Sequence, residues 1–213
     1  MISNRDEFEN ERKSRLDLLF SIIKQRLIYF CTPDVLLQKD EYKERPGWGG
    51  WLTVVLKSLQ NAQCLVAMGD ELRGTSNDEK EIFDRILKSV YECTEHNLVW
   101  VREQLHCELK EDLVSYYYPT TWVDAIEDGL QDEDWYLFNN RDGIEAHLNA
   151  PMFLHPDLIP DLKLVRLVKK ADLILQKKLI QWRSLIPIVD YELDQKLIFF
   201  PRSHWWWWRD EEV

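Results

Sequence analysis

A glutamate and a histidine at helical spacing are the first residues whose types could carry out chemistry. Glu103 and His106 are three positions apart, so a helix would place both on one face, as in di-iron carboxylate bundles. Such a centre needs a second Glu-x-x-His pair and two further inward carboxylates, and the other histidines do not supply that pair. We therefore expect no metal and no cofactor. A metal-dependent helical-bundle enzyme using Glu103 and His106 is the alternative.

Two short stretches match the PD-(D/E)xK pattern of metal-dependent nucleases. Pro33-Asp34 precedes Glu41-Tyr42-Lys43, and Pro156-Asp157 precedes Asp161-Leu162-Lys163. That chemistry needs carboxylates held on strands so that they converge on Mg²⁺, and both matches fall in helical or loop surroundings. The chain also lacks a G-x-S-x-G elbow and a glycine-rich phosphate loop. The sequence therefore predicts no catalytic residue and a protein that is not an enzyme.

The last predicted helix is basic although the chain has a formal net charge of -11. Four basic residues share its outward sector: Lys163, Arg166, Lys170 and Lys177. This face is either solvated, paired with the protein's own acidic helices, or a docking surface for an acidic partner. A nucleic-acid-binding subunit that uses the helix over 163–183 is a further alternative.

Four consecutive tryptophans near the C-terminus are the second unusual feature. In an extended segment, Trp205 and Trp207 face one way while Trp206 and Trp208 face the other. The segment either caps the apolar end of the bundle or forms an arm that binds a partner. Aromatic and arginine side chains commonly anchor interfaces, so we predict partner contacts at Trp205, Trp206, Trp207, Trp208 and Arg209.

Apolar residues at steps of three and four predict the elements that must position these side chains. Long helices are expected over 6–30, 51–72, 76–118 and 157–186. The third would be one continuous central strut that Pro119 ends. Shorter helices are expected over 34–38, 120–130 and 142–148, an acidic loop over 131–141, and a hairpin or extended arm over 188–200.

Composition indicates the fold class. The 213 residues are 45% hydrophobic and 31% charged with only 7 glycines, which is typical of a globular and largely helical chain. We predict an all-α helical bundle of about four long helices plus short connecting helices, with a small C-terminal extended or hairpin arm. The expected domains are the bundle over 1–187 and the aromatic-rich arm over 188–213.

Cysteine usage and charge bear on compartment and function. Cys31, Cys64, Cys93 and Cys107 show no C-x-x-C spacing and are expected to be buried thiols in a reducing cytoplasm. No apolar run reaches the ~18 to 20 residues of a membrane span. The acidic charge argues against general affinity for nucleic acid or anionic membranes. We therefore predict a cytoplasmic, regulatory protein that binds another protein as an accessory subunit, adaptor or inhibitor.

Overall fold

The computed structural model describes residues 5–31, 50–73, 77–122 and 131–183, whose regular structure is entirely helical. The helices are α1 (Arg5–Cys31), α4 (Trp51–Arg73), α5 (Asn77–His96), α6 (Leu98–Trp122), α7 (Gln131–Leu148), α8 (Ala150–Phe153) and α9 (Leu162–Arg183). The all-α bundle predicted from the sequence is confirmed. Of these helices, none has the length and apolarity needed to cross a bilayer.

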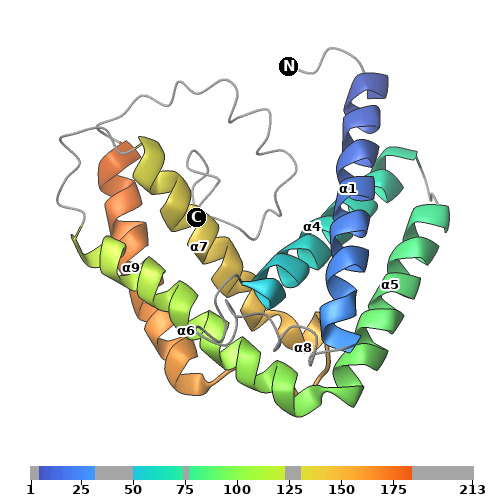
Figure 1. The fold of residues 1–213 in the computed structure, drawn as a ribbon. Helices are drawn as coiled ribbons and strands as arrows, with labels where there is room; N and C mark the ends of the chain where they lie inside the picture. Colours follow the sequence, from blue (N-terminus) through green and yellow to red (C-terminus); the bar gives the residue numbers. More distant parts are fainter. Residues whose placement is uncertain (1–4, 32–49, 74–76, 123–130, 184–213) are drawn as a thin grey trace.

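The helices form two groups that meet along α4 (Figure 1). The first group is α1, α4 and α5, and α1 packs against both of the others. The second group is α6, α7 and α9, in which α6 packs against both α7 and α9. Contacts between α4 and α7 join the groups, so the N-terminal part of the chain is tied to the second group through α4.

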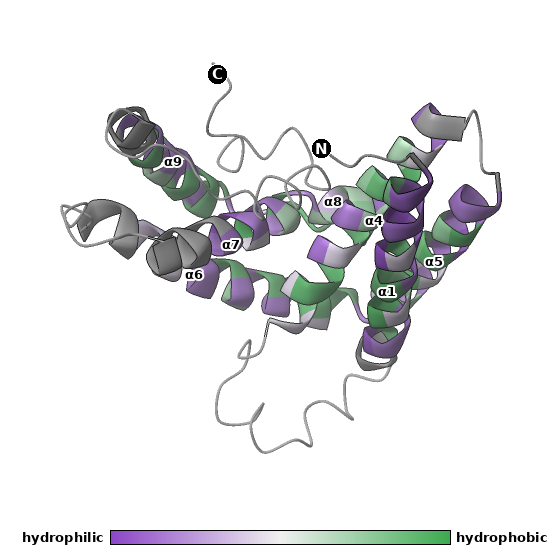
Figure 2. Cartoon of the chain, turned by 90° about the horizontal axis from the view of Figure 1, so that it is seen from above, coloured by the Kyte–Doolittle hydropathy of each residue, from purple (hydrophilic) through white to green (hydrophobic). Residues whose placement is uncertain are grey.

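Helix α4 supplies the largest share of the buried apolar side chains. Figure 2 shows hydrophobic residues along most of α4, whereas α1 and α5 alternate between hydrophilic and hydrophobic residues. The buried residues of α4 are Leu52, Val55, Leu56, Leu59, Ala62, Leu65 and Val66. A helix covered on one side buries only a narrow stripe, so the breadth of this set follows from contacts on several sides of α4.

The single helix expected over 76–118 is wrong, because the chain turns at Asn97 between α5 and α6. The Thr94 hydroxyl donates to the Val90 carbonyl (2.8 Å), and the Asn97 side-chain amide donates to the Cys93 carbonyl (3.0 Å). Such side-chain bonds compete with the helix ladder. The Asn97 carbonyl then accepts the Val101 amide (3.0 Å) and so begins α6. The result is the elbow between α5 and α6 in Figure 1.

Pro119 does not end the third predicted helix, because α6 continues to Trp122. A proline in a helix leaves the carbonyl four residues earlier without its usual donor. That carbonyl belongs to Ser115, and it accepts a bond from the Asn140 side-chain amide of α7 (3.4 Å). A neighbouring helix thus replaces the lost backbone bond.

Two further boundaries differ from the prediction. The acidic loop expected over 131–141 is the first part of α7, which also contains the short helix expected over 142–148. Helix α9 begins at Leu162 rather than at 157, and the Asp161 carboxylate caps it by accepting the Lys163 amide (2.7 Å). The predictions for 34–38, 123–130 and 188–213, including the arm, lie outside the described residues.

Cys93 differs from the expected state. Cys64 and Cys107 are free and half-buried, and burial raises the pKa of the Cys64 thiol, which keeps it protonated. Cys93, in contrast, is disulfide-bonded. The prediction of a thiol at Cys93 is therefore wrong, because a residue that looks like an apolar helix position in the sequence has a sulfur partner in the fold.

A buried arginine joins the three helices of the first group. Arg12 of α1 is fully buried and donates to Glu9 (2.7 Å), to Glu79 of α5 (2.9 Å) and to the Leu65 carbonyl of α4 (2.7 Å). An ideal Cβ at Gly69 would lie 2.9 Å from the guanidinium, so glycine provides the space that Arg12 occupies. The ion pairs of Arg12 therefore require the close packing that Gly69 permits.

We expect Arg12→Met to destabilise the protein by about 3–5 kcal/mol, because Glu9 would lose the charged donor with which it is buried and the Leu65 carbonyl would lose its second donor. The matched control is Arg15→Met, which removes an exposed ion pair with Glu11 on the same helix. This control should cost less than about 1 kcal/mol. Urea unfolding followed by circular dichroism measures both free energies. Equal losses in the two variants would contradict the assigned role of Arg12.

Candidate functional site

The described residue that precedes α4 cannot cap the helix with a side chain. This residue is Gly50, which has no side chain and has a positive φ of 55°. Instead, the Glu108 carboxylate of α6 accepts the amides of Leu52 (3.2 Å) and Thr53 (2.8 Å). A helix N-terminus carries unpaired N–H groups and a partial positive charge. The carboxylate from α6 accepts hydrogen bonds from two of these N–H groups, and its negative charge interacts favourably with the helix dipole. Glu108 therefore joins the start of α4 to the middle of α6.

Thr53 and His147 extend this contact to α7. The Thr53 hydroxyl donates to Glu108 Oε2 (2.9 Å) and lies 2.8 Å from His147 Nε2. His147 Nε2 is also 3.5 Å from Asp112 Oδ2, and both ring and carboxylate belong to this interhelical cluster. An ideal Cβ at Gly143 would lie 2.6 Å from Asp112 Oδ2, so glycine allows α7 to approach this closely. We call Thr53, Glu108, Asp112 and His147 the polar cluster.

Burial changes the acidity of two groups here. The pKa of Glu108 is raised because desolvation of the carboxylate outweighs the nearby His147 and the donors from Thr53 and Leu52. The pKa of Lys57 is lowered by desolvation, which the charges of Asp142 and Asp112 partly oppose. Lys57 also donates to the Asn139 carbonyl (3.2 Å). Both shifts favour the neutral form of a group at the junction of α4, α6 and α7.

The polar cluster does not form a hydrolase triad. A triad needs a hydroxyl whose proton passes to histidine, and a carboxylate bonded to the other ring nitrogen. Here the Thr53 hydroxyl donates to Glu108, and His147 Nδ1 has no hydrogen-bond partner. Within 5–31, 50–73, 77–122 and 131–183, no group of three His, Cys, Asp or Glu residues could hold a metal ion. The geometry of the cluster fits helix capping and junction packing.

A pocket of about 340 Å³ adjoins the polar cluster. Its walls come from α6, from α7 and from the segment that precedes α9. The lining residues are Arg102, Leu105, His106, Leu109, His147, Leu158, Ile159, Pro160 and Asp161. His147 is 2% exposed, so the pocket has a buried imidazole in a mainly apolar wall.

A third polar junction positions α9. Arg141 of α7 binds the Asp172 carboxylate of α9 through two nitrogens, at 2.8 and 3.0 Å. The Tyr116 hydroxyl of α6 donates to the same carboxylate (2.7 Å). Burial and the charge of Asp172 raise the pKa of Tyr116, so its hydroxyl remains a donor. The inner face of α9 is thereby held against α6 and α7.

The structure separates the residues predicted from the sequence. Glu103 and His106 are both exposed on α6, and His106 lines the pocket. The four basic residues predicted as an electrostatic face are exposed on α9: Lys163, Arg166, Lys170 and Lys177. Lys170 additionally lies 5.8 Å from the Tyr117 ring centroid. Residues 205–209 lie outside the described part of the chain.

The polar cluster was not predicted from the sequence, although a signal was present. Glu108 falls at helical spacing with Val101, Leu105 and Tyr116, which are all buried. A charge within an apolar stripe requires a buried partner, and the same applies to Arg12 within the stripe of α1. The partners of Glu108 could not be identified from sequence, because Leu52 and Thr53 lie more than fifty residues away.

Comparison of the chain with protein-family models, with curated proteins and with solved structures finds no match.

We expect Glu108→Ala to cost about 2–4 kcal/mol of stability, because two amides of α4 would lose their acceptor. Glu108→Gln should cost less, since the amide oxygen still accepts. Urea unfolding measures the free energies of the two variants. The matched control is Glu103→Gln, at an exposed position of α6, which should be near neutral.

The stability difference between the unmodified protein and Glu108→Gln should also depend on pH. The folded pKa of Glu108 is raised above its ordinary 4.5, so its contribution to stability is fully present below that pH. The contribution is lost as pH rises through the folded pKa. The stability difference between the unmodified protein and Glu108→Gln should therefore shrink as pH rises from 4.5. A difference that grows with pH would instead show that folding lowers the pKa of Glu108.

Proposed function

We propose that this protein is a non-enzymatic binding protein, acting as an accessory subunit, adaptor or inhibitor of an acidic protein partner. The outward face of α9 is the proposed docking surface. The observation that carries the proposal is the mixture of exposed leucines and basic residues on this face. Leu162 is 68% exposed and Leu173 is 59% exposed, and basic residues lie between them on the helix surface.

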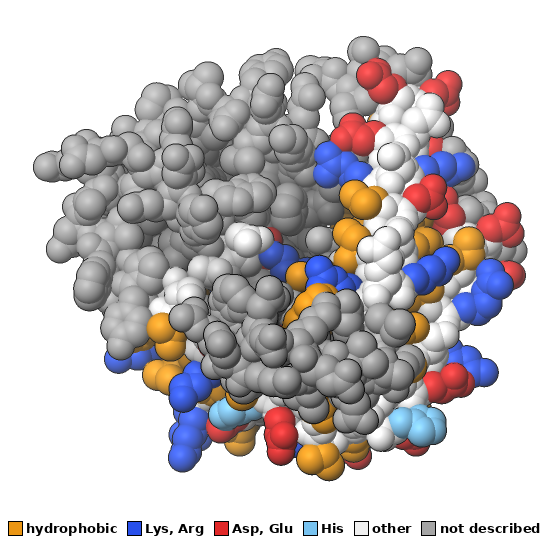
Figure 3. All heavy atoms as spheres, viewed as in Figure 1, with side chains coloured by type: hydrophobic (Ala, Val, Ile, Leu, Met, Phe, Trp, Pro, Cys, Tyr) orange, Lys and Arg blue, Asp and Glu red, His pale blue; other side chains and the backbone are white. Residues whose placement is uncertain are grey.

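The outward face of α9 is free for a partner because the contacts of α9 with α6 and α7 are made by its inner face. Val168, Ala171 and Leu175 are buried on the inner side, and Asp172 is bonded to Arg141 and Tyr116. The outward residues take no part in those contacts. In Figure 3, basic and hydrophobic side chains lie side by side at the lower left of the molecule, where Figure 1 places α6 and α9.

Charge supports an acidic partner. The chain has a net charge of -11, yet no acidic residue lies on the outward face of α9 between Leu162 and Lys177. A local basic surface on an acidic protein steers an acidic partner to one side and repels it elsewhere. The exposed leucines would then supply the apolar contacts that charge alone does not provide.

The C-terminal tryptophans are the second part of the proposal. Trp205, Trp206, Trp207, Trp208 and Arg209 are proposed as anchors because their residue types are those enriched at binding hot spots. We also propose a cytoplasmic location, because Cys64 and Cys107 are free thiols and thiols stay reduced in the cytoplasm. The bonded Cys93 counts against it, because disulfides persist mainly in oxidising compartments.

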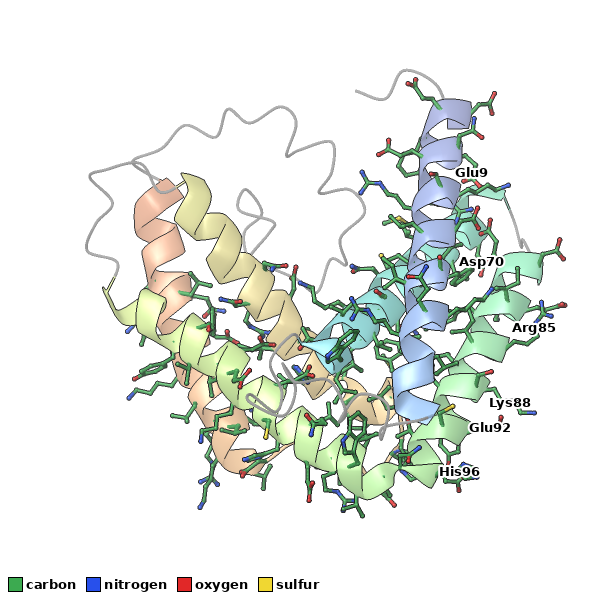
Figure 4. All side chains as sticks on the ribbon, viewed as in Figure 1. Glu9, Asp70, Arg85, Lys88, Glu92 and His96 are labelled. Atoms are coloured by element: carbon green, nitrogen blue, oxygen red, sulfur yellow. The ribbon has the colours of Figure 1, made fainter. Side chains whose placement is uncertain are left out.

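We expect the double variant Lys163→Glu/Arg166→Glu to lose the partner that the unmodified protein retains when purified from its native host. The matched control is Arg85→Glu/Lys88→Glu on α5, whose side chains point away from the bundle (Figure 4). Both baits change the net charge equally. Quantitative mass spectrometry compares recovery, and binding should weaken with added salt.

Three results would contradict docking of a protein on α9. Equal recovery with the two variants would show that the α9 charges are not used. Loss of the partner with both variants would show a response to net charge alone. Binding that disappears after nuclease treatment, together with salt-dependent binding to oligonucleotides, would support the nucleic-acid alternative.

Deletion of residues 203–213 should abolish partner recovery, because it removes the aromatic anchors. Helical circular dichroism and the melting temperature should change little, as expected for an arm that acts at the interface. These two measurements on the truncated protein check its fold. A large loss of stability would instead show that the tryptophans belong to the core.

A further inference from the structure

We infer that the docking surface on α9 continues over the neighbouring pocket, and that it binds an acidic peptide segment of the partner with one large apolar side chain. The apolar side chain enters the pocket, and carboxylates on either side of it bind basic residues of α6 and α9. This assignment rests on the proposed function, because it names the chemistry of the partner at the same surface. It adds the pocket and one face of α6 to that surface.

The pocket has buried apolar walls and an exposed rim. Leu105, Leu109 and Leu158 line it and are each at most 9% exposed, whereas Ile159, which also lines it, is 73% exposed. The volume of about 340 Å³ lies at the lower end of the range for ligand sites, roughly 300 to 1,000 Å³. This space suits one ring or one branched chain, so the rest of a bound peptide would lie across the rim.

Exposed apolar side chains connect the pocket to α9. Ile159 is followed three residues later by Leu162, which begins α9 and is 68% exposed. A partner that covers both side chains removes apolar surface from water, which favours binding. Asp161 lies between them, and its carboxylate accepts the Lys163 amide (2.7 Å). The acidic member of the lining is therefore engaged in capping α9.

Basic residues border the pocket on two sides. Arg102, His106 and Lys110 are exposed and follow one another at steps of four, so they share one face of α6. Of these, Arg102 and His106 line the pocket. Beyond the rim on the other side, Lys163 and Arg166 begin the basic face of α9. None of these five side chains forms an ion pair in the part of the chain that the structure describes.

Unpaired cations around an apolar pocket favour carboxylates that flank an apolar group. The exposed acidic residues closest in the chain to the lining, Glu103 and Asp157, are not part of it. A basic segment would be repelled by the rim, and an acidic segment without a large apolar residue would leave the pocket unused. The combination of charge and apolar anchor therefore defines the ligand.

Three capped pentapeptides test this assignment on the full-length protein. The probe is Glu-Asp-Phe-Asp-Glu, and the two comparison peptides replace its phenylalanine by alanine or its four acidic residues by lysine. Titration of the isotopically labelled protein should show saturable shifts of the Leu105 and Ile159 amides with the probe. The alanine peptide should bind about tenfold more weakly, because no ring is buried in the pocket. The lysine peptide should not bind.

Ile159→Ser tests the use of the pocket. This change removes an exposed apolar side chain from the rim, so it should leave the fold intact and weaken probe binding several-fold. Affinity for the alanine peptide should stay the same. The matched control is Met152→Ser on α8, which removes a 59% exposed side chain outside the lining and should change neither affinity.

Arg102→Glu/Lys110→Glu tests the face of α6. Reversal of two exposed charges should weaken probe binding about tenfold and remove most of its salt dependence. The matched control is Arg85→Glu/Lys88→Glu on α5, which changes the net charge equally and should leave probe affinity nearly unchanged.

Three outcomes would overturn the assignment. Absence of saturation with the probe up to about 10 mM would show that no acidic segment is recognised here. Equal affinity for the phenylalanine and alanine peptides would show that the pocket receives no side chain. Equal weakening by the α6 and α5 variants would show a response to net charge alone.

Failure of the assignment differs from failure of the proposed function. The proposed function is judged by recovery of the native partner with the α9 variant Lys163→Glu/Arg166→Glu. A partner lost with that variant but retained with Arg102→Glu/Lys110→Glu would leave docking on α9 intact and reject its extension over the pocket. A partner retained with both variants would reject both.

Discussion

The capping of α4 by Glu108 is the interaction on which the arrangement of the helices depends. Gly50 offers no side chain to the free amides of α4, and Glu108 takes over that role from α6. Since α4 carries much of the core of the first group and α6 is central to the second, one carboxylate relates the two groups. It also positions Thr53 beside His147, and hence brings the imidazole to the wall of the pocket.

Each group of helices has a buried or partly buried charged junction of its own, and the Glu108 contact lies between them. Arg12 joins α1, α4 and α5, while Arg141 joins α7 to α9 with Tyr116 of α6. A buried ion pair adds little net stability compared with apolar packing, but its loss is costly because one charge stays unpaired. We infer that these junctions select one register of the helices, while the leucines and valines supply most of the stabilising burial.

The inner and outer faces of α9 differ in burial and in composition. Asp172 and the buried aliphatic residues fix the inner face, whereas exposed leucines and basic residues occupy the outer one. The pocket lies next to the start of α9, where Asp161 both lines the pocket and caps the helix. The outer face of α9 and the pocket therefore differ in chemistry, one being basic with exposed leucines and the other mainly apolar.

Apolar periodicity and caps act over a few residues, so they were enough to predict the all-α class and the approximate extents of α1, α4 and α9. It also indicated the outward basic residues of α9. Three features were not predicted and became visible in the fold: the turn at Asn97, the continuation of α6 past Pro119 and the helix over 131–141. Only the fold brings Glu108 to Leu52, which lies 56 residues away in the chain. The physical reason is that a buried polar atom is paired by whichever group the packing brings near it, and that choice is not local.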